Sequence, residues 1–125
     1  SGGELSRVML SLKSLLTKNN NLPTIIFDEI DSGVSGETAD KVGQILAGMG
    51  KYMQVVNITH LPQVASRGTR HYHVFKDDSG DSTVTKIRLL TYEERIIEVA
   101  RLLSGSEITT TAIRNAKELL KAAVQ

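Results

Sequence analysis

The sequence predicts an α/β fold built on a parallel strand–helix–strand unit. Two short runs rich in β-branched residues, 24–27 and 53–59, flank a stretch, 37–49, whose apolar residues recur at helical spacing. The first run is continuously apolar, which is typical of a strand buried on both faces of a parallel sheet. A strand, a helix and a strand of these lengths form a right-handed βαβ crossover. The 125 residues are enough for one domain, 1–125, with a single core.

Further elements are predicted on both sides of this unit. Helical or strand-like periodicity favours helices over 5–17, 62–66, 91–103 and 109–124, and a hairpin formed by 71–76 and 83–90. Polar and glycine-rich stretches at 19–23 and 33–36 predict loops. Thr91 and Glu94 have the spacing of a capping box at the start of a helix.

The composition excludes several classes of site. The chain has no cysteine, so disulfides and thiolate metal sites are excluded and a cytoplasmic location is expected. No apolar run approaches the roughly 20 residues that span a bilayer, and we expect no membrane partner. The net charge of +1 gives no preference for nucleic acid.

The first candidate site is a pair of carboxylates, Asp28 and Glu29, at the end of the first predicted strand. Open α/β sheets bind ligands at the carboxyl ends of their strands. Successive strand residues point to opposite sides, so one carboxylate could serve a metal ion and the other a water molecule. A turn or helix-capping role is the alternative. His60 ends the second strand at the same edge and could donate a hydrogen bond to a phosphate there, or be incidental.

The chain opens with Ser1, Gly2, Gly3 and Glu4 before the predicted helix 5–17. Glycines let a backbone approach a ligand closely, and free amides at a helix start bind anions. A flexible loop with a cap is the alternative interpretation. His71 and His73 lie on one face of a predicted strand without acidic neighbours, and we interpret them as packing or surface residues.

The order of these motifs resembles the signature motif, Walker B, D-loop and H-loop of ABC ATPases. In the stretch FDEIDSGVSGETADKVGQIL, isoleucine and aspartate follow the Asp-Glu pair, and this pattern resembles that of SMC and Rad-type heads. The stretches QVVNITHLPQVASRGTRHYHVFK and EVARLLSGSEITTTAIRNAKELL resemble the RecN family of SMC-like DNA-repair ATPases. The resemblance covers essentially the whole chain and implies the C-terminal lobe of an ABC/SMC-type ATPase head.

The resemblance implies a role for each matching position. Glu29 would polarise the attacking water and His60 would contact the γ-phosphate of ATP. Asp28 would support Mg²⁺, through water. The nucleotide-binding signature would comprise Ser1, Gly2, Gly3 and Glu4. The D-loop would comprise Asp31, Ser32, Gly33, Val34 and Ser35. Ser35 departs from many SMC-like heads, which have an Asp there, so the charge across a dimer would change.

The sequence contains no P-loop, whose pattern G-x-x-x-x-G-K-[ST] holds the phosphates. The resemblance implies that this motif lies in an N-terminal half, with a coiled coil between the halves, and that the chain begins at the signature motif. We therefore expect no ATPase activity from these 125 residues alone, and activity in DNA double-strand-break repair and recombination from the full-length protein.

The resemblance also implies the partners. They are the Walker A half, a second head and DNA, at the nucleoid. We expect the isolated chain to self-associate through unpaired strand edges and apolar faces. The alternatives are an SMC-like head that organises chromosomes and a non-enzymatic dimerisation module.

Overall fold

The computed structural model describes residues 11–12 and 24–124. Residues 11–12 are helical, and the remainder of the helix predicted at 5–17, the loop at 19–23 and residues 1–4 lie outside the described residues. The chain divides into two compact units, Ser1–Arg67 and Gly68–Gln125.

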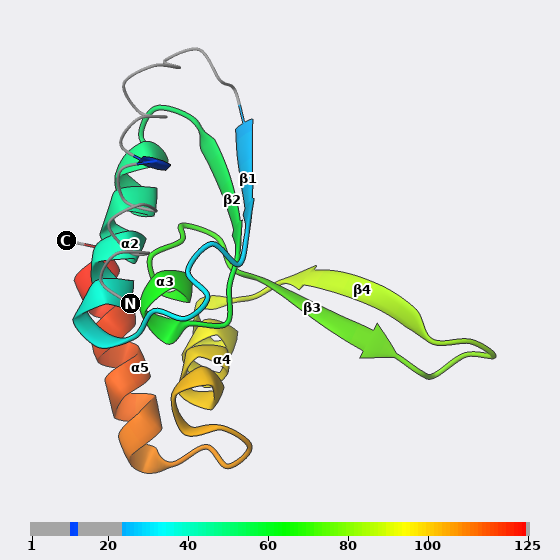
Figure 1. The fold of residues 1–125 in the computed structure, drawn as a ribbon. Helices are drawn as coiled ribbons and strands as arrows, with labels where there is room; N and C mark the ends of the chain where they lie inside the picture. The colour runs from blue at the N-terminus through cyan, green and yellow to red at the C-terminus, as the bar shows by residue number, and fades with distance from the viewer. Residues whose placement is uncertain (1–10, 13–23, 125) are drawn as a thin grey trace. The chain divides into compact units, whose positions relative to one another are not determined.

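The first unit contains the predicted strand–helix–strand (Figure 1). Its elements are β1 (Thr24–Asp28), α2 (Gly36–Met49), β2 (Gln54–Ile58) and α3 (Pro62–Ala65). β1 and β2 are parallel, with a register that runs from Thr24 opposite Gln54 to Asp28 opposite Ile58. The parallel pairing predicted from the apolar runs is therefore confirmed.

The core of this unit lies between one face of the strands and α2. Its buried side chains are Leu12, Phe27, Val42, Leu46, Met49, Met53 and Val64. In α2 these residues recur at three- and four-residue spacing, so they share one side of the helix. Burial of this stripe, not helix propensity, holds α2 in place, because α2 has three glycines, Gly36, Gly43 and Gly48.

The prediction that the first strand is buried on both faces is wrong for the described residues. Ile26 is 67% exposed, and its neighbours on β2, Val56 and Ile58, are 41% and 50% exposed. Side chains alternate along a strand, so these three belong to the face opposite Phe27. The described part of the chain places a helix on one face of the sheet and leaves the other open.

α3 packs against α2 at a glycine. A Cβ atom at Gly43 would lie 2.9 Å from the carbonyl oxygen of Gln63 and 3.0 Å from Cγ of Arg67. The absence of a side chain therefore permits this close approach. The Arg67 guanidinium also donates to Asp40 of α2 at 2.9 Å, which ties the end of α3 to the same helix.

The second unit is a hairpin and a pair of helices. β3 (Tyr72–Asp77) and β4 (Val84–Leu89) are antiparallel, with Tyr72 opposite Leu89 and Asp77 opposite Val84. α4 (Tyr92–Ser104) and α5 (Thr110–Ala123) pack on each other through Val99, Ala100, Ala112, Ala116 and Leu120. The predicted hairpin and both predicted helices are confirmed.

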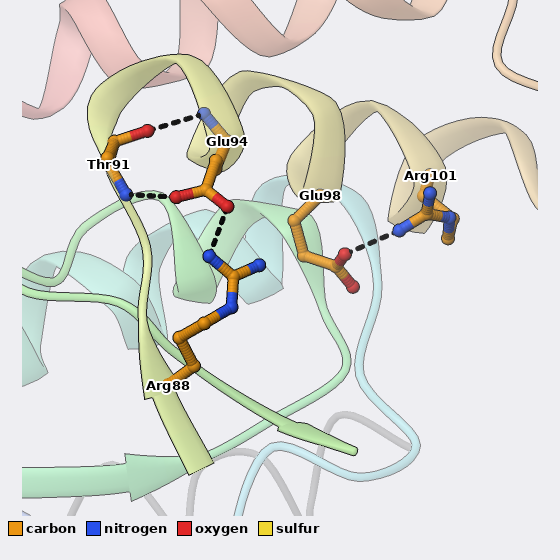
Figure 2. A network of polar contacts seen from close by, with 5 residues as sticks. All are labelled: Arg88, Thr91, Glu94, Glu98 and Arg101. Atoms are coloured by element: carbon orange, nitrogen blue, oxygen red, sulfur yellow. Dashed lines mark hydrogen bonds and ion pairs between the residues drawn. The ribbon is translucent and has the colours of Figure 1, made fainter. Parts of the chain in front are cut away.

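The start of α4 has the predicted capping box. Thr91 Oγ1 accepts from the Glu94 backbone N–H at 3.2 Å, and the Glu94 carboxylate accepts from the Thr91 N–H at 3.0 Å. Figure 2 shows Arg88 of β4 donating to the same carboxylate, so the box also links strand to helix. The Thr91 backbone bond, followed by Arg88, lowers the pKa of Glu94. Farther along α4, Arg101 pairs with Glu98 at 2.7 Å.

Candidate functional site

The carboxyl ends of β1 and β2 bring together the two predicted catalytic residues. Glu29 follows β1, and its backbone N–H donates to the Ile58 carbonyl oxygen at 2.9 Å, extending the pairing beyond the strand. His60 follows β2 by two residues, and its Nδ1 lies 3.8 Å from Oε1 of Glu29. The two side chains remain 54% and 59% exposed, so both face solvent and can reach a bound molecule.

Glu29 has an unusual backbone conformation. Its φ is +51°, the left-handed region that non-glycine residues rarely adopt. Its carbonyl oxygen accepts from the Ser32 N–H at 3.1 Å, and the Asp31 carbonyl oxygen accepts from the Val34 N–H at 3.2 Å, which forms a tight turn. Such strain, of about 1–3 kcal/mol, persists where surrounding contacts hold it and clusters at functional sites.

The predicted D-loop residues have different exposures. Ser32, Gly33 and Ser35 are exposed, and Gly33 has a φ of +85° that favours glycine. Ser35 stands at the N-cap of α2 without a capping hydrogen bond from its side chain, so its hydroxyl is not used by the helix. Asp31, in contrast, is fully buried and points into the unit.

Asp31 makes a contact that the sequence did not suggest. Its Oδ2 accepts from the Thr59 hydroxyl at 2.5 Å, and the Thr59 oxygen accepts from the Leu61 N–H at 3.1 Å. Asp31 Oδ1 is buried and has no hydrogen-bond partner among the described residues. Side-chain alternation along β2 would have predicted the inward position of Thr59, because Thr59 falls on the covered face with Val55 and Asn57. It gives no such signal for Asp31.

Asp28 lies at the same edge, on the open face. It is exposed and pairs in register with Ile58. Within 11–12 and 24–124, no three acidic, histidine or cysteine side chains are arranged to hold a metal ion by themselves. The predicted nucleotide-binding residues 1–4 lie outside the described residues.

The two histidines of the second unit have packing environments. His71 is half-buried, and burial lowers the pKa of its imidazole, with a further contribution from the Arg95 charge. His73 stacks on Phe75 with ring centroids 5.7 Å apart.

No helix of the described part of the chain has the length and apolar character that crossing a bilayer requires.

Known proteins are similar to this chain over nearly its full length. The DNA repair protein RecN of Haemophilus influenzae is 47% identical over 120 residues, which cover 96% of this chain and 22% of that protein. The RecN proteins of Vibrio cholerae and Bacillus subtilis are 47% and 42% identical, over 98% and 100% of the chain. The chain is a RecN-type segment. It spans about a fifth of the length of these RecN relatives, 22% in each of the three.

The fold of the RecN-type segment agrees with a solved structure. A chain from work on ATP-driven dimerization and DNA-stimulated activation of SMC ATPases matches with a TM-score of 0.68. The match covers 86% of this chain and 64% of that one at 19% identity, so it shows the fold alone. The predicted α/β fold is confirmed, because this chain shares it with a chain from an SMC ATPase structure. No family model matches the chain.

Proposed function

We propose that this segment supplies the water-activating side of an ATP hydrolysis site in a RecN-type, SMC-like ATPase of DNA repair. The contact between Glu29 and His60 carries the proposal, because it joins a carboxylate and an imidazole at the exposed carboxyl edge of a parallel sheet. The relatives named DNA repair protein RecN support DNA repair as the biological setting. Within it, we propose a role in double-strand-break repair and recombination.

Glu29 is the proposed general base. Its carboxylate is exposed, and the turn at φ +51° holds it beside His60 and clear of the core. It would accept a proton from the water that attacks the γ-phosphate. His60 would donate a hydrogen bond to a γ-phosphate oxygen, where negative charge develops during phosphoryl transfer.

Asp28 fits a role at Mg²⁺. Its carboxylate is a hard oxygen ligand and is exposed at the same strand end as Glu29. When bound, Mg²⁺ would neutralise charge on the phosphates. Asp28 would hold the ion through water, with the remaining ligands coming from ATP and from outside the described residues. The nucleotide itself would contact Ser1, Gly2, Gly3 and Glu4.

The proposal requires partners. The phosphates need a P-loop, which this sequence lacks, so the Walker A half of the same protein and a second head would complete the site. Ser32, Gly33, Val34 and Ser35 would form the part of the D-loop that faces the second head. DNA would be the polymer on which the heads act, in the cytoplasm at the nucleoid. The 125 residues alone would not hydrolyse ATP.

Substitution of Glu29 in the full-length protein tests this function. Glu29→Gln keeps the shape and removes the base, so turnover should fall at least about 100-fold while ATP binding remains. Asp28→Asn should instead weaken Mg²⁺-dependent ATP binding. Glu107→Gln, in the loop between α4 and α5, is the matched control and should change neither quantity. A Glu29→Gln protein that hydrolyses ATP at the wild-type rate would refute the proposal.

A further inference from the structure

The turns that carry Glu29 and His60 are joined by one buried side-chain bond. Asp31, fully buried, accepts from Thr59 at 2.5 Å. Asp31 follows Glu29 by two residues, and Thr59 immediately precedes His60. The bond therefore connects the segment after β1 to the segment after β2, close in sequence to both members of the exposed pair.

The Thr59 hydroxyl acts in both directions. Besides donating to Asp31, it accepts from the Leu61 N–H at 3.1 Å. Leu61 is the N-cap of α3, so the hydroxyl spans His60 and fixes the turn in which that residue lies.

The exposed pair depends on this support. Glu29 and His60 are each more than half exposed, so packing contributes little to their positions. Their separation follows mainly from the backbone beneath them, which the Glu29–Ile58 backbone bond and the Asp31–Thr59 bond hold together. Asp31 Oδ1 lacks a partner in the described part of the chain, so the Thr59 hydroxyl is the donor that compensates this buried carboxylate.

We propose that Asp31 and Thr59 are positioning residues that set the distance between Glu29 and His60. Neither touches the nucleotide in this assignment, and both act through the turns on which the two exposed residues stand. The inference rests on the proposed function, because it assumes that Glu29 and His60 act on one phosphate. A misplacement of about 1 Å can slow an enzyme by about 100-fold.

Two substitutions at Thr59 separate positioning from stability. Thr59→Val removes the hydroxyl and keeps the shape, whereas Thr59→Ser keeps the hydroxyl. The matched control is Thr24→Val, because Thr24 makes the corresponding side-chain bond, 3.0 Å to Gln54, at the other end of the same two strands. All three are made in the full-length protein.

We call the two hydrogen bonds of the Thr59 hydroxyl, to Asp31 and to the Leu61 N–H, the clamp. Hydrogen exchange tests the clamp without reference to activity. Exchange is followed in a peptide covering 60–63. Pro62 has no amide hydrogen and the first residue exchanges rapidly, so the signal comes mainly from the Leu61 and Gln63 amides. Thr59→Val should speed this exchange about tenfold, the equivalent of one net hydrogen bond. Thr59→Ser and Thr24→Val should match the wild type. Unchanged exchange in Thr59→Val would overturn the clamp.

Turnover then decides whether the clamp positions the site. With ATP saturating, Thr59→Val should lose about 10- to 100-fold in kcat while ATP affinity stays within about twofold. Thr59→Ser should recover kcat to within about threefold. Faster exchange with an unchanged kcat would overturn positioning and leave the proposed function standing. Wild-type turnover by Glu29→Gln would instead overturn the proposed function, with the exchange data still deciding whether the clamp exists.

Discussion

Adding one methyl group at Gly43 should destabilise the first unit, although alanine favours helices. Replacing glycine by alanine inside a helix contributes about 1 kcal/mol of stability. The new Cβ at Gly43 would lie 2.9 Å from a backbone oxygen of α3, a separation that requires the helices to move apart. Overpacking of this kind costs about 1–3 kcal/mol. We therefore expect Gly43→Ala to lower the free energy of unfolding by up to about 2 kcal/mol.

Gly48 provides the matched control in the same helix. A Cβ there meets nothing within 4 Å, so Gly48→Ala should raise the free energy of unfolding by up to about 1 kcal/mol. The propensity gain is similar for both variants, and the difference between them isolates the contact with α3. That difference should be about 1–3 kcal/mol.

Urea unfolding of the two variants, followed by circular dichroism, measures this difference. In thermal unfolding it corresponds to about 4–8 °C for each kcal/mol in a unit of 60–100 residues. Equal stability of Gly43→Ala and Gly48→Ala would refute the close approach of α2 and α3. Because α3 begins two residues after His60, Gly43→Ala in the full-length protein should also disturb the turn that carries His60.

Three further outcomes follow from the structure. Thr91→Ala should lower the free energy of unfolding by about 1 kcal/mol through loss of the capping box, and Thr91→Ser should restore it, as measured by urea unfolding. The pKa of Asp77, lowered to about 2 by its bonds to Lys86 and Ser79, should rise toward 3.8 in Lys86→Met when followed by NMR, and an unchanged value would remove the ion pair as the cause. The open sheet face predicts that the chain self-associates and that Ile26→Lys returns it toward a monomer, whereas light scattering from a 13.6 kDa monomer of the wild type at high concentration would contradict this.

The predictable features of the site come from local patterns. The apolar run ending in Asp28 and Glu29 and the run before His60 have strand periodicity, and a helical stretch joins them. Parallel strands linked by one crossover must end at the same edge, so their terminal residues meet. The 3.8 Å contact between Glu29 and His60 agrees with that reasoning, although its catalytic role remains a proposal.

The clamp between Asp31 and Thr59 could not be predicted in this way. The two residues are 28 positions apart, and their pairing depends on how tightly the chain turns after Glu29. Nothing in local periodicity specifies a φ of +51° at a glutamate. The family resemblance grouped Asp31 with the D-loop residues Ser32, Gly33, Val34 and Ser35, but its side chain is fully buried, whereas Ser32, Gly33 and Ser35 are exposed.

The error over the burial of β1 has a related cause. A continuous apolar run shows that both faces of a strand favour burial, but it does not identify what covers them. Here α2 covers the face with Phe27, and Ile26, Val56 and Ile58 stay exposed. The apolar composition of this run correctly predicted a strand. It did not correctly predict that both faces of that strand are covered.

The open face and the proposed site are continuous. Side chains alternate along β1, so Asp28 projects from the same face as Ile26, and the register places it beside Ile58. Any surface that covers the exposed apolar side chains must therefore end next to the carboxylate proposed to act at Mg²⁺. If the Walker A half is that surface, its addition should displace self-association of this chain, because both would use one face. Self-association that persists at saturating concentrations of that half would show that the copies meet elsewhere, and the open face would then need another partner.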